Sequence, residues 1–175
     1  PTTPRRQRQM CIRDRLKMFY NHKHSMYFRD YAMQTNKPLY SFGFGLSYTK
    51  FDISSPKLNS SKFKKGVLSV SVNVKNIGEI TGDEIVQLYI SDKYSSITRP
   101  VKELKAYQRV SLKPGESKEI VFELNKSDFA YYDSDMNYVV EAGDFDILVG
   151  NSSRDEDLKN RNFNSEKTFY LSCLL

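Results

Sequence analysis

The sequence contains no tryptophan, and only two cysteines and two histidines stand among its 175 residues. Without tryptophan, no indole ring is available as a platform for a sugar or a base. Cys11 and Cys173 lie near opposite ends and have neither CxxC spacing nor histidine partners, which excludes a zinc ribbon and a disulfide framework. His22 and His24 are separated only by Lys23, and a metal site there would need further ligands from elsewhere. We therefore predict no metal site and no cofactor.

Long apolar runs and an evenly spread basic charge are also missing. No run approaches the roughly 20 apolar residues that a membrane-spanning helix needs, so no membrane association is predicted. Residues 1–15 hold five arginines and one aspartate, whereas the rest of the chain holds 22 basic and 20 acidic residues. A nucleic-acid partner is not predicted, because the basic signal belongs to a terminal stretch. No apolar stretch follows these arginines, so we expect residues 1–15 to be a foreign or disordered basic tail and not a signal peptide.

Residues 16–45 are rich in aromatic side chains but show neither a period of 2 nor a period of 3.6. Gly43 and Gly45 interrupt any regular element near the end of this stretch. Its aromatic residues would form an apolar patch if they were exposed together, which a soluble monomer rarely tolerates. We therefore expect an irregular N-terminal extension that lies along another surface. Those aromatic residues are Phe19, Tyr20, Tyr27, Phe28, Tyr31, Tyr40, Phe42 and Phe44.

From Leu46 onward, short strands alternate with turn signals. Val70, Val72 and Val74 alternate with polar residues, as in a half-buried strand. Residues 84–91 (EIVQLYIS) are apolar on both faces, which is typical of a central strand. Residues 113–116 (KPGE) form a hairpin signal, because proline presets φ and glycine accepts a positive φ.

The alternation continues to the last clear strand of the pattern. Residues 117–124 place three apolar side chains on one face, and Phe145, Ile147 and Val149 do the same further on. No stretch carries a sustained helical period with caps. These features predict an all-β antiparallel sandwich over residues 46–153. Residues 154–175 are expected to form a polar tail, with a possible edge strand from Phe163 to Leu171.

Six segments occur in a recognisable order. They are residues 38–49 (PLYSFGFGLSYT), 74–78 (VKNIG), 82–90 (GDEIVQLYI), 99–104 (RPVKEL), 112–117 (LKPGES) and 144–150 (DFDILVG). In this order they resemble the C-terminal region of the family 3 glycoside hydrolases, the β-glucosidase and β-xylosidase family. The first segment is similar to that family's YPFGYGLSYT junction, although Ser41 stands where the family often has proline and Phe44 where it often has tyrosine. The resemblance extends from about Phe19 to Ser153.

The resemblance implies a fibronectin type III-like, immunoglobulin-like β-sandwich, preceded in residues 16–45 by the end of an α/β domain and a linker. Whole members of the family typically add a barrel domain and an α/β sandwich domain, which supply the nucleophile and the acid/base. Retaining hydrolysis needs two carboxyl groups about 5–5.5 Å apart across the bond that is cut. The family's nucleophile motif is not found here, so no catalytic residue is assigned. The implied partners are those two domains and, through them, a carbohydrate substrate; members are both exported and cytoplasmic, so the compartment stays open.

Two groups of residues are candidates for contacts with these domains. His22, Lys23, Arg29 and Asp30 fall in the stretch that lies beside the family's active-site domain. They could bind a sugar in an outer subsite or anchor the linker, and we favour anchoring. Phe42 and Phe44, with Tyr94 and Arg99 of the loop at 91–100, are candidates for interdomain or loop contacts. Tyrosine can stack on a sugar and arginine can bind a carboxylate, but docking of this loop is the preferred reading.

Acidic residues offer two further candidate sites, and a structural explanation is preferred for both. The carboxylates of residues 133–146 could include an acid/base pair, but charges on turns and strand faces explain them better. Asp144 and Asp146 simply flank the inward-facing Phe145 and Ile147. The run Asp155-Glu156-Asp157 lacks the spacing of a calcium loop.

The sequence therefore leads to one main hypothesis and one alternative. The chain is predicted to be the C-terminal fragment of a family 3 β-glycosidase, structural in role and inactive alone. The alternative is a stand-alone binding or adhesion module of fibronectin type III shape. The aromatic-rich stretch of residues 19–44 argues against that alternative, because a self-sufficient module has no need of it.

Overall fold

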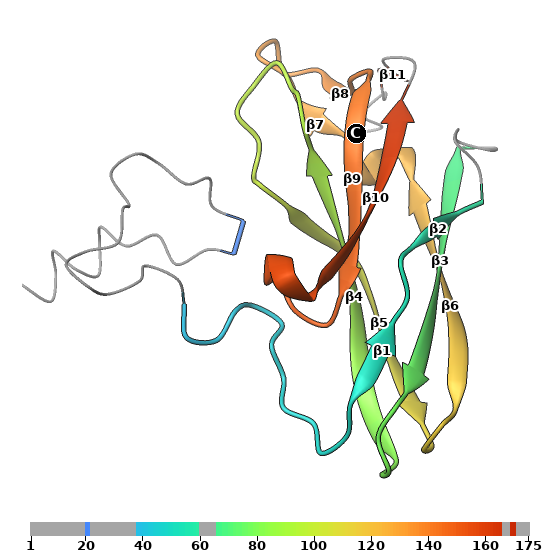
Figure 1. Ribbon diagram of the computed structural model, residues 1–175. Coiled ribbons are helices and arrows are strands. Elements are labelled where there is room, and N and C mark those ends of the chain that lie inside the picture. The colour runs from blue at the N-terminus through green and yellow to red at the C-terminus, as the bar shows by residue number, and fades with distance from the viewer. Residues whose placement is uncertain (1–19, 22–37, 60–65, 166–168, 171–175) are drawn as a thin grey trace, which may run out of the picture.

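The computed structural model describes residues 20–21, 38–59, 66–165 and 169–170, and almost all of its regular structure is strand (Figure 1). Two single-turn 3-10 helices, η1 (Lys126–Asp128) and η2 (Asp155–Asp157), interrupt the strands. The strands are β1 (Phe51–Ile53), β2 (Lys57–Leu58), β3 (Val67–Asn76), β4 (Gly82–Asp92), β5 (Glu103–Leu112), β6 (Ser117–Asn125), β7 (Tyr131–Tyr132), β8 (Tyr138–Val140), β9 (Gly143–Gly150), β10 (Leu158–Ser165) and β11 (Phe169–Tyr170).

Two antiparallel sheets face each other as the layers of a sandwich (Figure 1). In one sheet β3 pairs with β6 along one edge and with the short strands β1 and β2 along the other. The second sheet has the order β10-β9-β4-β5, so β4 and β9 lie inside it. A small sheet of β11, β8 and β7 closes one end of the sandwich. The predicted all-β antiparallel sandwich is confirmed.

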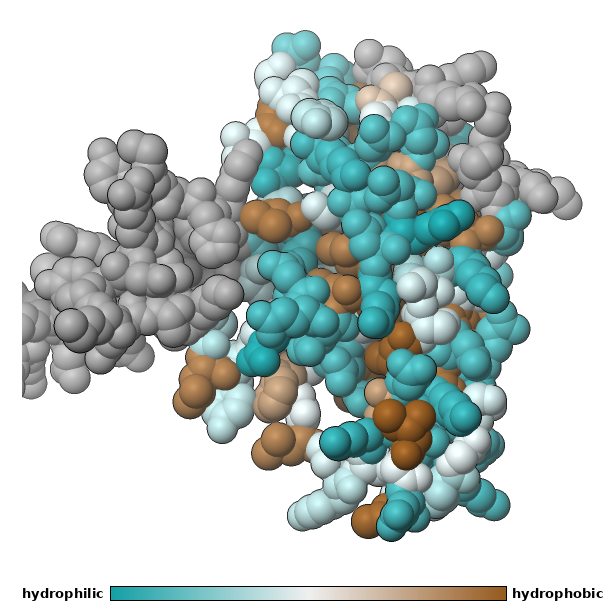
Figure 2. Space-filling view, in the orientation of Figure 1, coloured by the Kyte–Doolittle hydropathy of each residue, from teal (hydrophilic) through white to brown (hydrophobic). Residues whose placement is uncertain are grey.

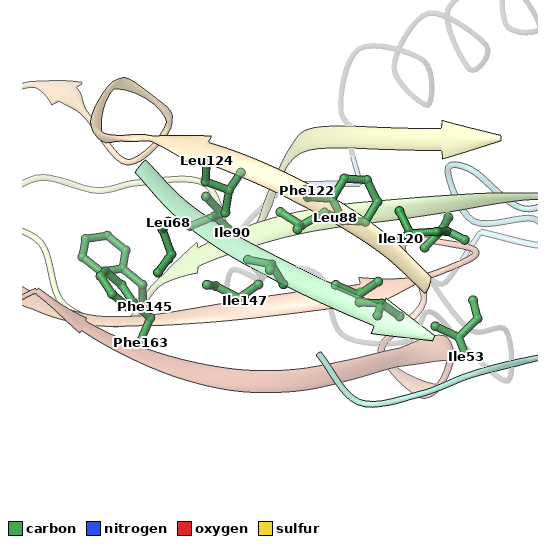
Figure 3. Packing of buried hydrophobic residues seen from close by; sticks show 14 of the residues in the cluster. Ile53, Leu68, Leu88, Ile90, Ile120, Phe122, Leu124, Phe145, Ile147 and Phe163 are labelled. Carbon is green, nitrogen blue, oxygen red and sulfur yellow. The ribbon is translucent and has the colours of Figure 1, made fainter. Parts of the chain in front are cut away.

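The core lies between the two main sheets and is built by alternation along the strands (Figure 3). Val70, Val72 and Val74 of β3 are buried, while the residues between them face outward or are only partly covered. Across the core, Phe145 and Ile147 of β9 are buried in the same way. Burial of each such side chain contributes about 1.5–3 kcal/mol, and one face of each strand supplies it. The alternation predicted for β3, β6 and β9 is confirmed.

The central strand β4 differs from its neighbours because both of its faces are covered. Five consecutive residues, from Val86 to Ile90, are buried. Val86, Leu88 and Ile90 belong to the core, whereas Gln87 and Tyr89 lie outside that cluster, on the opposite face of the sheet. The prediction of a central strand is confirmed, and its second face is where other segments pack.

The sheet also continues beyond the boundary at residue 153. β10 takes residues 158–165 into the sheet beside β9, in an unbroken antiparallel register. The edge strand was expected from Phe163 onward, and it begins five residues earlier, at Leu158. Apart from Leu158 and Phe163 its side chains are polar, which suits an edge strand but gives a weak sequence signal.

Candidate interdomain surface

Residues 38–50, called the leader below, pass along the outer face of β4 before the chain enters β1 (Figure 1). The leader has no strand or helix of its own, and hydrogen bonds from the sandwich hold it at separate points. Gly43 lies against Gln87 near the middle of β4, and Ser47 lies near Gly82 at its start. The leader therefore belongs to the module's own surface.

The side-chain amide of Gln87 is the first anchor of the leader. Its Nε2 donates to the carbonyl oxygens of Gly43 and Asn151, each at 3.0 Å. Its Oε1 accepts a hydrogen bond of 2.5 Å from the hydroxyl of Tyr89. Burial raises the pKa of Tyr89 to about 12, so this phenol remains a protonated donor. Both amide protons and one lone pair of the amide oxygen are thereby used inside the protein, which fixes the position of the leader backbone.

Gly43 makes this close approach possible. Its φ of +78° lies in the left-handed region, which side chains with a Cβ rarely adopt. A Cβ at this position would lie 2.1 Å from Oε1 of Gln87. Only glycine satisfies both the backbone conformation and the contact with the amide.

An aromatic stack reinforces the first anchor. The rings of Tyr20 and Phe42 are stacked with centroids 4.4 Å apart, and Tyr20 meets the buried ring of Tyr89 edge-on at 5.9 Å. The hydroxyl of Tyr20 accepts a hydrogen bond from the amide of Leu104. The carbonyl of Phe42 accepts one from the amide of Ser153, at 2.8 Å. The leader thus contacts β4 and the turn that follows β9, and Tyr20, which stacks on the leader, contacts β5.

Asn76 and Thr49 form the second anchor. Asn76 is fully buried, and its Oδ1 accepts hydrogen bonds from the Thr49 hydroxyl at 2.7 Å and from the Gly78 amide at 3.0 Å. Its Nδ2 donates to the carbonyl oxygens of Ile80 and Leu112. A Cβ on Gly78 would lie 2.1 Å from the Thr49 hydroxyl oxygen. Any side chain at position 78 would therefore displace this hydroxyl. One asparagine therefore joins the leader, the turn after β3 and the end of β5.

The leader exposes most of its apolar side chains although its backbone is anchored. Leu46 is 90% exposed and Tyr48 is 99% exposed, while Tyr40, Phe42 and Phe44 are exposed to lesser degrees. Figure 2 shows hydrophobic residues along this segment, in brown at the lower left of the view. Such a group of exposed apolar side chains is typical of an interaction surface.

Arg99 holds the base of the loop at residues 92–101. Its Nη1 donates to Oδ2 of Asp92 at 2.9 Å and to the carbonyl of Phe129 at 3.2 Å, and its Nη2 lies 3.7 Å from a carboxylate oxygen of Glu103. Its guanidinium lies 4.8 Å from the centre of the Tyr131 ring. Burial raises the pKa of Asp92, and the bond from Arg99 opposes that rise. The carboxylate that Arg99 binds is therefore internal.

A second set of contacts closes the same loop against β7 and against Glu141, which follows β8. The amide of Ser96 donates to Oε2 of Glu141 at 3.0 Å, and the Ser96 hydroxyl is 3.0 Å from that of Tyr131. Partial burial acts to raise the pKa of Glu141, but hydrogen bonds from Tyr131 and Ser96 outweigh it and lower the pKa. Tyr94 is left exposed near the start of the loop. Tyr94 is therefore an exposed side chain on a loop that internal hydrogen bonds hold in place.

Three further acidic residues, Asp133, Asp144 and Asp146, have local partners. Asp133 accepts hydrogen bonds from the amides of Asp135 and Asn137, and the Asn137 amide is the main reason that its pKa is lowered. Asp144 accepts from the side chain of Asn164, and Asp146 pairs with Lys93. Within the described ranges, no group of three or more histidine, cysteine or acidic side chains is arranged to hold a metal ion.

The structure places the predicted contact residues in different settings. Phe42 and Phe44 lie on the leader, Tyr94 is exposed near the start of the loop, and the side chain of Arg99 is buried at the base of that loop. His22, Lys23, Arg29 and Asp30 lie outside the described residues. In the part of the chain that the structure describes, no helix is long and apolar enough to cross a membrane.

Sequence reasoning missed both anchors. Asn76 looked like an ordinary turn residue, and Gln87 was one letter in an apolar strand. The available signal was the position of Gln87 itself. A strand that is apolar on both faces leaves an amide no access to water, so a glutamine there requires internal partners.

Comparisons with known proteins agree on one kind of module. The family model described as "Fibronectin type III-like domain" matches residues 84–153. A β-xylosidase of Formosa agariphila is 47% identical over 130 residues, which cover 74% of this chain and 18% of that protein. Thermostable β-glucosidase B of Acetivibrio thermocellus is 47% identical over 134 residues, covering 75% of this chain and 18% of that protein.

Solved structures agree with these relatives. A β-glucosidase structure from Erythrobacter marinus superposes with a TM-score of 0.76 at 39% identity, covering 83% of this chain and 19% of that chain. The chain thus spans about 18% of the length of the curated relatives it matches.

Proposed function

The chain belongs to the C-terminal, fibronectin type III-like region of the family 3 glycoside hydrolases, and on that premise we propose that it serves as a structural module of a β-glycosidase. In this role it packs against the catalytic domains of the same polypeptide and performs no hydrolysis by itself. The full-length protein would cleave O-glycosidic bonds of carbohydrates.

One observation carries this proposal. The leader is anchored to the sandwich by Gln87 and Asn76, yet Leu46 and Tyr48 remain almost wholly exposed. Anchoring an exposed apolar segment costs conformational entropy and hides little apolar surface. Packing against a neighbouring domain would bury these apolar side chains and so offset the entropy cost. The relatives supply the neighbour, because about four-fifths of their length lies outside the matched region.

The contacts of the acidic residues support a structural role and not a catalytic one. Hydrolysis with retention needs two carboxyl groups about 5–5.5 Å apart on either side of the scissile bond, one free to act as nucleophile and the other as acid/base. The carboxylates of Asp92, Glu141 and Asp133 instead accept hydrogen bonds from Arg99, Ser96 and the turn at 133–137. Each is occupied in holding a loop in place.

A chimera tests the proposal directly. The matched region of thermostable β-glucosidase B would be replaced by the matching residues of this chain, and turnover of an aryl β-glucoside would be measured. We expect the chimera to turn over substrate and to unfold in one cooperative transition, and the present chain to show no turnover. Hydrolysis by this chain, purified free of other glycosidases, would contradict the proposal, as would independent unfolding of the module in the chimera.

A further inference from the structure

The stretch between the two anchors, residues 44–48, is called the arch. On one side of it, Gln87 and Ser153 hold the carbonyl oxygens of Gly43 and Phe42. On the other side, the buried Asn76 holds the hydroxyl of Thr49. The arch is fixed at both ends by groups that belong to the sandwich.

Local hydrogen bonds also define the ends of the arch. The amide of Phe44 donates to the carbonyl of Ser41 at 3.0 Å, and the amide of Thr49 lies 3.3 Å from the hydroxyl of Ser47. The ring of Phe44 packs against that of Tyr40, with centroids 5.4 Å apart. Leu46 and Tyr48, in contrast, have almost no cover from the module. The arch holds one aliphatic and one aromatic side chain outward in a set position.

Such an arrangement favours docking. A segment that is already fixed in its bound shape loses little conformational entropy on association, so more of its burial appears as binding free energy. Leucine and tyrosine together offer an apolar surface and a hydroxyl that can find a partner at the edge of a pocket. Among the residues that the structure describes, neither side chain makes a contact that would explain its position.

We propose that the arch is the element by which the module engages the catalytic domains, with Leu46 and Tyr48 entering an apolar pocket on them. This inference rests on the proposed function, because the occupant is the remainder of the same polypeptide. The matched relatives support that occupant, since the matched region is only 18% of their length. Gln87 and Asn76 act as positioning residues that set where the two side chains point.

The main test replaces Leu46 and Tyr48 by serine, singly and together, in this chain and in the chimera. Because both side chains are exposed, the Tm of this chain should change by about 1 °C or less. The Tm of the chimera should fall by roughly 5 °C or more in the double variant, because its buried contacts are lost. Val121→Ser and Tyr107→Ser are matched controls, since both residues are exposed and lie outside the arch and its two anchors. Neither control should lower the Tm of the chimera.

A second variant tests the positioning role. Gln87→Leu keeps the size of the side chain and removes the bonds to Gly43 and Asn151. We expect hydrogen exchange of the Phe44 and Ser153 amides to accelerate by about tenfold or more, with little change in the amides that pair β3 with β6. Uniform acceleration across the sandwich would indicate general destabilisation and would contradict a positioning role.

The outcomes separate this inference from the proposed function. If the serine variants leave the chimera unchanged while it still unfolds as one unit, the module docks through another surface and the arch proposal is overturned alone. If the module unfolds independently in the chimera, the proposed function fails as well. If this chain sediments as a dimer that Tyr48→Ser dissociates, the occupant is a second copy, and the proposal is wrong.

Discussion

Gln87 and Tyr89 face away from the core on the central strand β4, and the tyrosine hydroxyl donates to the glutamine amide oxygen at 2.5 Å. The pair places a polar contact inside a buried layer between the sheet and the leader. It leaves both protons of the Gln87 amide for carbonyl groups outside the strand. The Tyr89 hydroxyl therefore orients the Gln87 amide, and the amide in turn positions the leader.

Tyr89→Phe removes the donor and should leave the Gln87 oxygen buried without a partner. An unsatisfied buried acceptor costs about 1–3 kcal/mol, so the free energy of unfolding should fall by that amount. Urea unfolding followed by circular dichroism measures it. Tyr107→Phe removes an exposed hydroxyl from β5 and should change the same quantity by about 0.5 kcal/mol or less. Equal effects for the two variants would argue against the anchor.

Gly43→Ala should release the leader and leave the sandwich folded. The new Cβ would meet the Gln87 amide, and the backbone φ of +78° is unfavourable for alanine. Chymotrypsin should then cleave after the exposed aromatic residues of the leader at least several-fold faster, because local opening exposes the backbone. Gly45→Ala is the matched control, since a Cβ at Gly45 would meet no atom within 4 Å. Identical cleavage rates in both variants would contradict the anchoring role of Gly43.

Asn76→Ala should be the most destabilising of these substitutions. It removes a side chain with four hydrogen bonds from a fully buried position and strands two carbonyl groups, those of Ile80 and Leu112. We expect a loss of roughly 2–4 kcal/mol in the free energy of unfolding. Asn73→Ala, at an exposed position of the same strand, should cost much less. A small effect at Asn76 would mean that water replaces its bonds.

The strands of the sandwich could be predicted because their signal is local. Alternation of Val70, Val72 and Val74 with polar residues requires only neighbouring positions, and the core face follows from it. Residues 113–116 gave the hairpin for the same reason, and Gly115 has the expected positive φ of 75°. The start of β10 escaped prediction, because an edge strand with polar side chains lacks this alternation.

The anchors could not be predicted because their partners are distant in sequence. Gln87 binds Gly43 across 44 residues, and Asn76 binds Thr49 across 27 residues. Such contacts follow only from the path of the folded chain. Arg99 shows the same limit: its residue type suggested a carboxylate, but only the structure shows that this is Asp92 of its own loop.

Glu84→Gln should stabilise the protein at neutral pH. Burial is the main cause that raises the pKa of Glu84, and bonds from Ile85 and Asn151 only partly oppose it. Because the pKa of Glu84 is higher in the folded state, folding disfavours its ionised form. The free energy of unfolding is therefore highest below the ordinary glutamate pKa and falls as the pH rises through the raised pKa. Glutamine keeps an acceptor oxygen but does not ionise. The stability advantage of Glu84→Gln should thus be absent near pH 3, grow as the pH rises above about 4, and level off near neutrality.

Thermal unfolding measured across this pH range tests the sign of the effect, and Glu119→Gln on the exposed face of β6 controls for the change in net charge. An advantage that is as large at pH 3 as at pH 7 would exclude ionisation of Glu84 as its cause.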